Sequence, residues 1–114
     1  MMPDVLAIRR LDDDTAEVAI ALPADHPAFA GHFPDRPILP GVVQLDWAVR
    51  LAARSFGHAF RPTRRFQIKY TRLLTPLPAD SSVSLRLGRV RRGITFTYRV
   101  GDTILSSGRI WLDA

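Results

Sequence analysis

One segment of this 114-residue chain has the periodicity of a helix, and it is apolar around most of its circumference. The segment runs from about Val42 to Phe56, and Gly57 directly after it suits a C-terminal cap. A helix that is apolar nearly all round is normally buried. The rest of the chain is therefore expected to enclose it. The apolar positions are Val42, Val43, Leu45, Ala48, Val49, Leu51, Ala52 and Ala53.

The surroundings of this helix have the pattern of strands. Before it, strand-like runs at about Val5–Arg10 and Ala16–Leu22 are separated by the polar turn Asp12-Asp13-Asp14-Thr15. A loop rich in Pro and Gly from Pro23 to Gly41 then leads to the helix. Alternating runs with turns at Arg91-Arg92-Gly93 and Gly101-Asp102 occupy the second half; they include Phe66–Thr71, Val83–Leu87, Ile94–Val100 and a last strand through Trp111 and Leu112. The order favours an α+β fold, an antiparallel β-sheet wrapped around one central α-helix, with residues 1–114 forming one domain.

Composition narrows the possible functions. Hydrophobic residues make up 46% and charged residues 24%, a profile typical of soluble globular proteins. No apolar run approaches the roughly 20 residues of a membrane span, and no secretory signal is evident at the start, so we expect a cytoplasmic protein. There is no cysteine, which excludes disulfides and Cys-ligated metals, and no cofactor or metal motif is present.

The formal net charge is +5, and fifteen of the sixteen basic residues are Arg. Such a surface attracts an acidic partner, although a bias in base composition explains the Arg excess equally well. No pattern of a nucleic-acid-binding module is present. Four arginines are candidates for a partner-docking patch: Arg61, Arg64, Arg65 and Arg72.

The stretch from Gly31 to Asp46 combines three features that suit acid–base chemistry. His32 lies in a loop restrained by prolines, and an imidazole titrates near neutral pH. Pro40-Gly41 leads directly into the helix, so the unpaired amides near Gly41 and Val42 form a positive helix end that a ligand can approach. Asp46 places a carboxylate on an otherwise apolar helix, where an ionisable group needs a reason.

These groups suit the elimination of water from a 3-hydroxyacyl thioester. His32 would take the proton from C2, and Asp46 would hold the hydroxyl group and assist its departure. The amides of Gly41 and Val42 would stabilise negative charge on the thioester oxygen.

The same stretch resembles the FabA/FabZ group of 3-hydroxyacyl-[acyl-carrier-protein] dehydratases. The matching residues are Gly31-His32-Phe33-Pro34, Pro40-Gly41 and Asp46, and the segment from Lys69 to Pro76 is similar to the strand and Pro-containing turn of that group. Within the group, the run from Leu39 to Ala48 looks most like the ApeI-like dehydratases of aryl polyene biosynthesis.

The resemblance implies a hotdog fold in which two protomers pair their sheets. It also implies that the acid of one subunit completes a site with the histidine of the other, so that a homodimer, a larger homo-oligomer or a heterodimer with another hotdog subunit is the active unit. The substrate would be carried on acyl carrier protein, in fatty-acid or aryl polyene-type biosynthesis. That partner is acidic, which would give the arginines a purpose.

One residue departs from the pattern. Dehydratases of this group often carry Gln four residues after the acid, where this chain has Arg50. Arg50 lies one helical turn from Asp46, and a neighbouring cation favours the ionised form of a carboxyl group, which makes a poorer proton donor. Three consequences are open: an altered choice of substrate, a role for Asp46 limited to positioning, or a weakened enzyme. Two alternatives to a dehydratase stay open: a hotdog acyl thioesterase, and a non-catalytic partner subunit of a mixed hotdog dimer.

Three aromatic residues near the motif have two interpretations, and two histidines have one. Phe29, Phe33 and Trp47 line an acyl tunnel or belong to the core. His26 and His58 lie outside any constellation and are expected at the surface.

Overall fold

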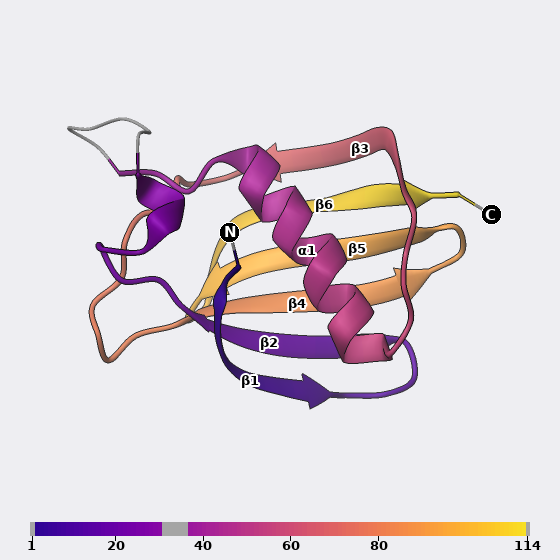
Figure 1. Cartoon of the computed structure of the whole chain (residues 1–114), viewed down its shortest axis with the longest axis horizontal. Helices are drawn as coiled ribbons and strands as arrows, with labels where there is room; N and C mark the ends of the chain where they lie inside the picture. The colour runs from indigo at the N-terminus through magenta and orange to yellow at the C-terminus, as the bar shows by residue number, and fades with distance from the viewer. Residues whose placement is uncertain (1, 31–36, 114) are drawn as a thin grey trace.

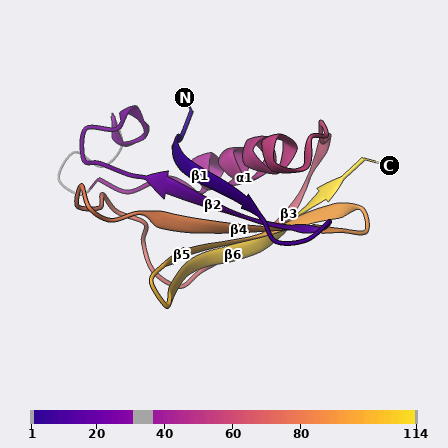
Figure 2. The same cartoon turned by 90° about the horizontal axis from the view of Figure 1, so that it is seen from below.

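The computed structural model describes residues 2–30 and 37–113. One helix, α1 (Gly41–Phe56), lies across one face of a six-stranded sheet with the strand order β1-β2-β4-β5-β6-β3, in which all neighbours are antiparallel (Figure 1). The strands are β1 (Asp4–Arg10), β2 (Thr15–Ala21), β3 (Pro62–Tyr70), β4 (Val83–Val90), β5 (Gly93–Val100) and β6 (Thr103–Leu112). Figure 2 shows the helix on one side of a twisted sheet. This is the hotdog fold, as the sequence resemblance implied.

The ends of α1 follow from its flanking residues. Pro40 precedes the first turn and accepts hydrogen bonds from the amides of Val43 and Gln44, both at 3.1 Å. At the other end Gly57 adopts a left-handed conformation (φ 65°), and its amide bonds to the carbonyl of Ala53. Glycine reaches this conformation without the penalty that a side chain would bring, which confirms the predicted C-cap.

The core lies between α1 and the inner face of the sheet. Alternate residues of β2, β4 and β5 point toward the helix, and burying each of their larger apolar side chains stabilises the fold by roughly 1.5–3 kcal/mol. These residues are Ala16, Val18, Ile20, Val83, Leu85, Leu87, Ile94, Phe96 and Tyr98; on the helix they meet Trp47, Ala48, Leu51 and Ala52.

The helix is less enclosed than its sequence predicts. One face packs on the sheet, but Val42 is 72% exposed, and Leu45 and Val49 are only partly buried. Among the described residues, this second apolar face meets only the edge strand β3, across a pocket that is open to solvent. The polar stripe predicted from Asp46, Arg50 and Arg54 does face solvent.

The loop before the helix also differs from the prediction. A short 3₁₀ turn at Pro27–Phe29 interrupts what the sequence indicated to be irregular chain. His26 caps this turn, because its imidazole accepts a hydrogen bond from the amide of Ala28.

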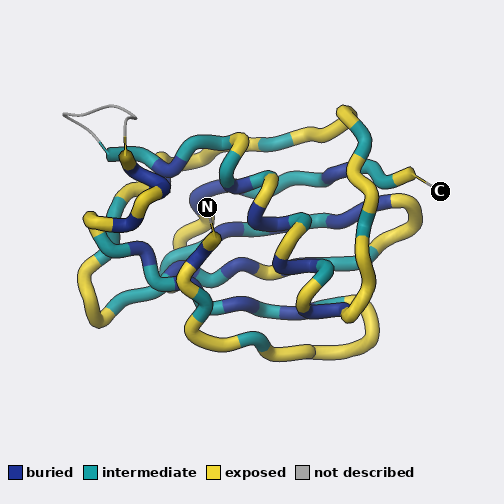
Figure 3. The backbone as a smooth tube through the Cα atoms, viewed as in Figure 1, coloured by how far each residue is buried: buried dark blue, intermediate teal, exposed yellow. Residues whose placement is uncertain are grey.

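The edge strand β3 is mostly exposed, whereas burial is concentrated in the central strands and the inner face of α1 (Figure 3). Its pairing with β6 is regular from Phe66 to Tyr70 but shifts register between Pro62 and Phe66. A register shift re-aims side chains, and such irregularities are common beside active sites. Among the described residues, no helix has the length and apolar character that crossing a membrane requires.

Candidate active site

Asp46 lies on the exposed stripe of α1, one turn inside the helix. Arg50 Nε donates a hydrogen bond to its Oδ2 at 2.9 Å, and both side chains are about half exposed. The predicted pairing of these two residues is therefore present. An exposed pair at this spacing contributes little to stability, about 0.3–0.5 kcal/mol.

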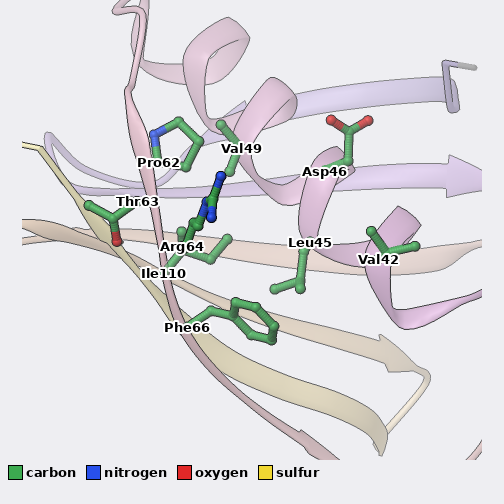
Figure 4. A pocket seen from close by; sticks show the side chains of 9 residues that line it. All are labelled: Val42, Leu45, Asp46, Val49, Pro62, Thr63, Arg64, Phe66 and Ile110. Atoms are coloured by element: carbon green, nitrogen blue, oxygen red, sulfur yellow. The ribbon is translucent and has the colours of Figure 1, made fainter.

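An apolar pocket of about 330 Å³ lies between α1 and β3, with Asp46 at its rim. Figure 4 shows Leu45 and Phe66 facing each other across it, while the Asp46 carboxylate points outward. The pocket is open to solvent because Val42 and Phe66 are at least half exposed. Its walls are Val42, Leu45, Asp46 and Val49 of α1, Pro62, Thr63, Arg64 and Phe66 of β3, and Ile110 of β6.

The register shift in β3 explains how this pocket forms. Successive residues of a regular strand point to opposite faces, yet Pro62, Thr63 and Arg64 all line the pocket. They lie where the pairing with β6 is interrupted. Sequence reasoning missed the pocket walls on β3, because a register shift depends on the partner strand and leaves no periodic signal of its own.

The start of α1 offers two free amides. The amides of Gly41 and Val42 find no hydrogen-bond acceptor among residues 2–30 and 37–113, as expected for a helix N-terminus. A cavity of about 320 Å³ adjoins this turn, lined by Ile38, Leu39, Pro40, Gly41, Gln44, Tyr70, Leu73 and Leu74. The helix start is therefore next to space that a ligand group could enter.

The side chain of Tyr70 provides a second reason why position 41 is a glycine. The Tyr70 hydroxyl packs against Gly41 so closely that a Cβ at this position would overlap it. The sequence suggested only that glycine lets a ligand approach the amides. In this structure the neighbour is the end of a half-exposed tyrosine side chain from β3.

His32 and Phe33 lie outside the described residues, as does Gly31. The chain that flanks them lies at the end of the molecule where α1 begins (Figure 1). The predicted pairing of His32 with Asp46 therefore stays a prediction.

Two of the three candidate tunnel aromatics belong to the core. Trp47 is fully buried and Phe29 nearly so, and neither lines the pocket at Asp46. Trp47 points to the inner side of α1, one residue after Asp46 on the outer side. Of the two interpretations for these residues, the structure favours packing.

The prediction for His26 was wrong, because this residue is buried and not at the surface. Its Nδ1 accepts from the Ala28 amide at 3.0 Å, and its Nε2 lies 3.9 Å from Asp4 Oδ2. Its ring also meets Trp47 edge-on at 5.5 Å between centroids. The His-Pro dipeptide was the available signal, since a side chain before a turn-starting proline can cap the turn. His58, by contrast, is exposed as expected.

The four arginines proposed for docking do not share one environment. Arg64 lines the pocket at Asp46, and the Arg65 guanidinium lies 4.3 Å from the centre of the Trp111 ring. Arg61 and Arg72 line two other grooves. Only Arg64 is placed to meet a ligand that enters the pocket.

The sequence matches a known family over most of its length. The family model described as ApeI-like, ApeI dehydratase, matches residues 8–109. The chain belongs to the ApeI-like dehydratase family.

Solved structures agree with this family. This ApeI-like chain superposes on a chain of the dehydratase heterocomplex ApeI:P from Xenorhabdus doucetiae with a TM-score of 0.88 and 26% identity, over 100% of both chains. An uncharacterized protein from Erwinia carotovora subsp. atroseptica is 30% identical, with a TM-score of 0.76 over 99% of this chain and 97% of that one.

Curated relatives of the ApeI-like chain carry the name 3-hydroxyacyl-[acyl-carrier-protein] dehydratase FabZ. The protein of Agrobacterium fabrum (strain C58) is 29% identical over 97 residues, which cover 80% of this chain and 63% of that protein. The chain thus spans less than two thirds of the length of the curated relatives that it matches, 63% in this case and 30% in another.

Proposed function

We propose that the chain is a 3-hydroxyacyl-[acyl-carrier-protein] dehydratase, which eliminates water to give a trans-2-enoyl thioester. The observation that carries the proposal is the position of Asp46. It lies at the rim of an apolar pocket, on the same helix as two unpaired amides, within the part of the chain that matches the ApeI-like family. Fatty-acid or aryl polyene-type biosynthesis is the setting that we propose for this reaction.

In the proposed reaction, His32 takes the proton from C2 of the substrate. The amides of Gly41 and Val42 stabilise the negative charge that develops on the thioester oxygen. Asp46 delivers a proton to the C3 hydroxyl, which leaves as water while the electrons of the C2–H bond form the double bond. The apolar pocket holds the acyl chain, with Leu45 and Phe66 as its facing walls.

A second hotdog subunit completes the site in this proposal. Strand β3 is an edge strand, so the outer side of its backbone is available for pairing. Its exposed Phe66 lines the pocket, and its exposed Tyr70 lines the cavity at the start of α1. A partner at this edge would cover the open side of the pocket and bring its own His32 toward Asp46. The partner is a second copy of this chain or a related hotdog subunit, and the acyl carrier protein delivers the substrate in the cytoplasm.

Two observations support a second candidate function, that of a partner subunit in a mixed dimer. Asp46 already accepts a hydrogen bond from Arg50, so one oxygen of its carboxylate is occupied within its own chain. The structural relative from Xenorhabdus doucetiae is itself named as a heterocomplex. On this proposal the chain would contribute His32, or only its fold, to a site whose acid comes from the other subunit.

A dehydration assay with a carrier-bound 3-hydroxyacyl thioester tests the main proposal. We expect conjugated enoyl product from the wild type and a loss of at least ~10²-fold in kcat for His32→Ala and for Asp46→Asn, since each removes one acid–base group. Full activity in both variants would reject these assignments.

The same assay separates the alternatives. Release of free thiol without an enoyl product identifies a thioesterase. An inert single chain that becomes active with a second hotdog subunit, and that then tolerates Asp46→Asn, identifies a partner subunit.

A further inference from the structure

A buried side-chain amide, that of Gln44, sits directly beneath the start of α1. Gln44 is 2% exposed and faces the sheet, two residues before Asp46 on the same helix. An apolar side chain would fill this position without the cost of burying an amide, so the amide needs a reason.

Every polar atom of the Gln44 side chain has a partner. Its Nε2 donates to the carbonyl of Leu39 at 3.0 Å, and its Oε1 accepts from Ser106 Oγ of β6 at 2.7 Å. One end of this side chain thus holds the loop that precedes the helix, and the other end is anchored to the sheet.

Two more hydrogen bonds complete the clamp. The Tyr98 hydroxyl of β5 donates to the backbone carbonyl of Gln44 at 2.7 Å, and the Leu39 amide donates to the carbonyl of Leu74 at 2.7 Å. Burial raises the pKa of Tyr98 well above its usual value, and the charge of Asp46 acts in the same direction, so this phenol remains a donor. All five residues of the clamp, Leu39, Gln44, Leu74, Tyr98 and Ser106, are buried.

The clamp holds the segment that carries the two free amides. Pro40, Gly41 and Val42 lie between Leu39 and Gln44, the two points at which the segment is tied to the sheet and to Leu74. Fully satisfied buried networks of this kind are rigid, and they specify one geometry. A shift of the helix start by about 1 Å would be costly for catalysis even though no reacting group is lost.

We propose that Gln44 is a positioning residue, which aims the amides of Gly41 and Val42 at the thioester oxygen through its bonds to Leu39 and Ser106. The inference rests on the proposed dehydratase function. It adds to the residues needed for that reaction one that does not contact the substrate. Because the amides act on charge that develops during the reaction, loss of the clamp lowers kcat more than it changes KM.

Gln44→Met tests the proposal, since methionine has a similar length and volume but no amide. We expect kcat to fall roughly 10–10²-fold with KM changed less than about threefold. Ser106→Ala, which removes one anchor, should have a smaller effect in the same direction. The double variant Gln44→Met/Ser106→Ala should have a kcat no lower than that of Gln44→Met, because both substitutions remove the same Gln44–Ser106 hydrogen bond.

The chain offers a matched control. Ser55 is buried on the same helix, and its hydroxyl has no hydrogen-bond partner in the part of the chain that the structure describes. Ser55→Ala should leave kcat and KM unchanged. Measuring all variants well below their unfolding midpoints separates positioning from a general loss of folded protein.

A readout without substrate separates failure of this inference from failure of the proposed function. Amide hydrogen exchange at Leu39, Val43 and Gln44, whose amides are hydrogen-bonded, should accelerate at least about tenfold in Gln44→Met and stay unchanged in Ser55→Ala. If the wild type fails to dehydrate any substrate, the proposed function is wrong, and exchange alone decides whether the clamp exists. Wild-type kcat in Gln44→Met, or unchanged exchange at the helix start, would overturn the role of Gln44.

Discussion

The ion pair between Asp46 and Arg50 adds little to folding, yet it lies at the carboxyl group that we propose for the reaction. The pair is short, at 2.9 Å, but about half of each side chain is exposed to water. Screening by solvent makes its contribution to stability small. The same hydrogen bond occupies Oδ2 of the carboxylate that we propose to assist departure of the substrate hydroxyl group.

Arg50→Gln is the residue-scale prediction that follows. We expect the free energy of unfolding to change by less than about 0.5 kcal/mol, since an exposed pair at this spacing is lost. We expect kcat for dehydration to rise, because Asp46 Oδ2 no longer accepts a hydrogen bond from Arg50 Nε and is free to meet the substrate. Arg54→Gln on the same stripe is the control, and steady-state kinetics with thermal unfolding measure both. A drop in kcat for Arg50→Gln alone would mean that Arg50 serves the reaction directly.

The role of a single residue could be predicted from the sequence where it depends only on residues a few positions away along the chain. The Asp46–Arg50 pair follows from a four-residue step, and the Gly57 cap follows from its place after an apolar helix. The burial of His26 and the role of Gln44 were not predictable in this way. Asp4 and Trp47 contact His26, while Leu39 and Ser106 bind Gln44, and only the folded chain brings these residues together.

At the scale of elements, the contact between β3 and β6 depends on a glycine. Gly108 of β6 lies beside the Gln67 backbone of β3 and the Phe96 ring of β5, and a Cβ at this position would overlap the Gln67 carbonyl oxygen. It would also lie 2.7 Å and 2.9 Å from two carbon atoms of the Phe96 ring. Backbone cannot move aside as a surface side chain can.

Gly108→Ala should therefore destabilise the edge of the sheet. We expect the free energy of unfolding to fall by about 1–3 kcal/mol, the usual cost of overpacking, and the melting temperature to fall by about 4–8 °C for each kcal/mol. Ser107→Ala, at the neighbouring half-buried position, is the control. An unchanged melting temperature for Gly108→Ala would show that β3 adjusts freely.

Elements were easier to predict from sequence than their arrangement. Alternating apolar residues indicated the strands, and one apolar periodicity indicated α1. The pairing of β3 with β6, and the register shift that opens the pocket near Thr63, are properties of two strands together. No pattern within either strand alone encodes them.

At the scale of the whole molecule, the two edges of the sheet differ. The β3 edge adjoins both the pocket at Asp46 and the cavity at the start of α1. Exposed Phe66 and Val42 line the pocket, and exposed Tyr70 and Leu73 line the cavity. The β1 edge exposes Leu6 but adjoins neither cavity. This asymmetry favours β3 as the assembly edge.

Phe66→Lys should weaken assembly at that edge. Burial of each Phe66 ring at the interface would contribute about 1.5 kcal/mol to the free energy of dimerisation. Losing it for two symmetry-related rings would raise the dimer dissociation constant about a hundredfold. Leu6→Lys on the opposite edge is the control and should leave it unchanged. Sedimentation velocity across a dilution series measures both. Equal weakening by the two variants would place the interface elsewhere.

An edge strand that pairs through its main chain has an evolutionary consequence. Peptide amides and carbonyls are the same in every protein, so this mode of recognition survives extensive drift of side chains. Two copies of a duplicated gene can then lose resemblance and still join. One copy is free to discard its acid or its histidine as long as the other keeps what was lost, and division of labour between sister genes becomes an accessible outcome for a fold of this kind.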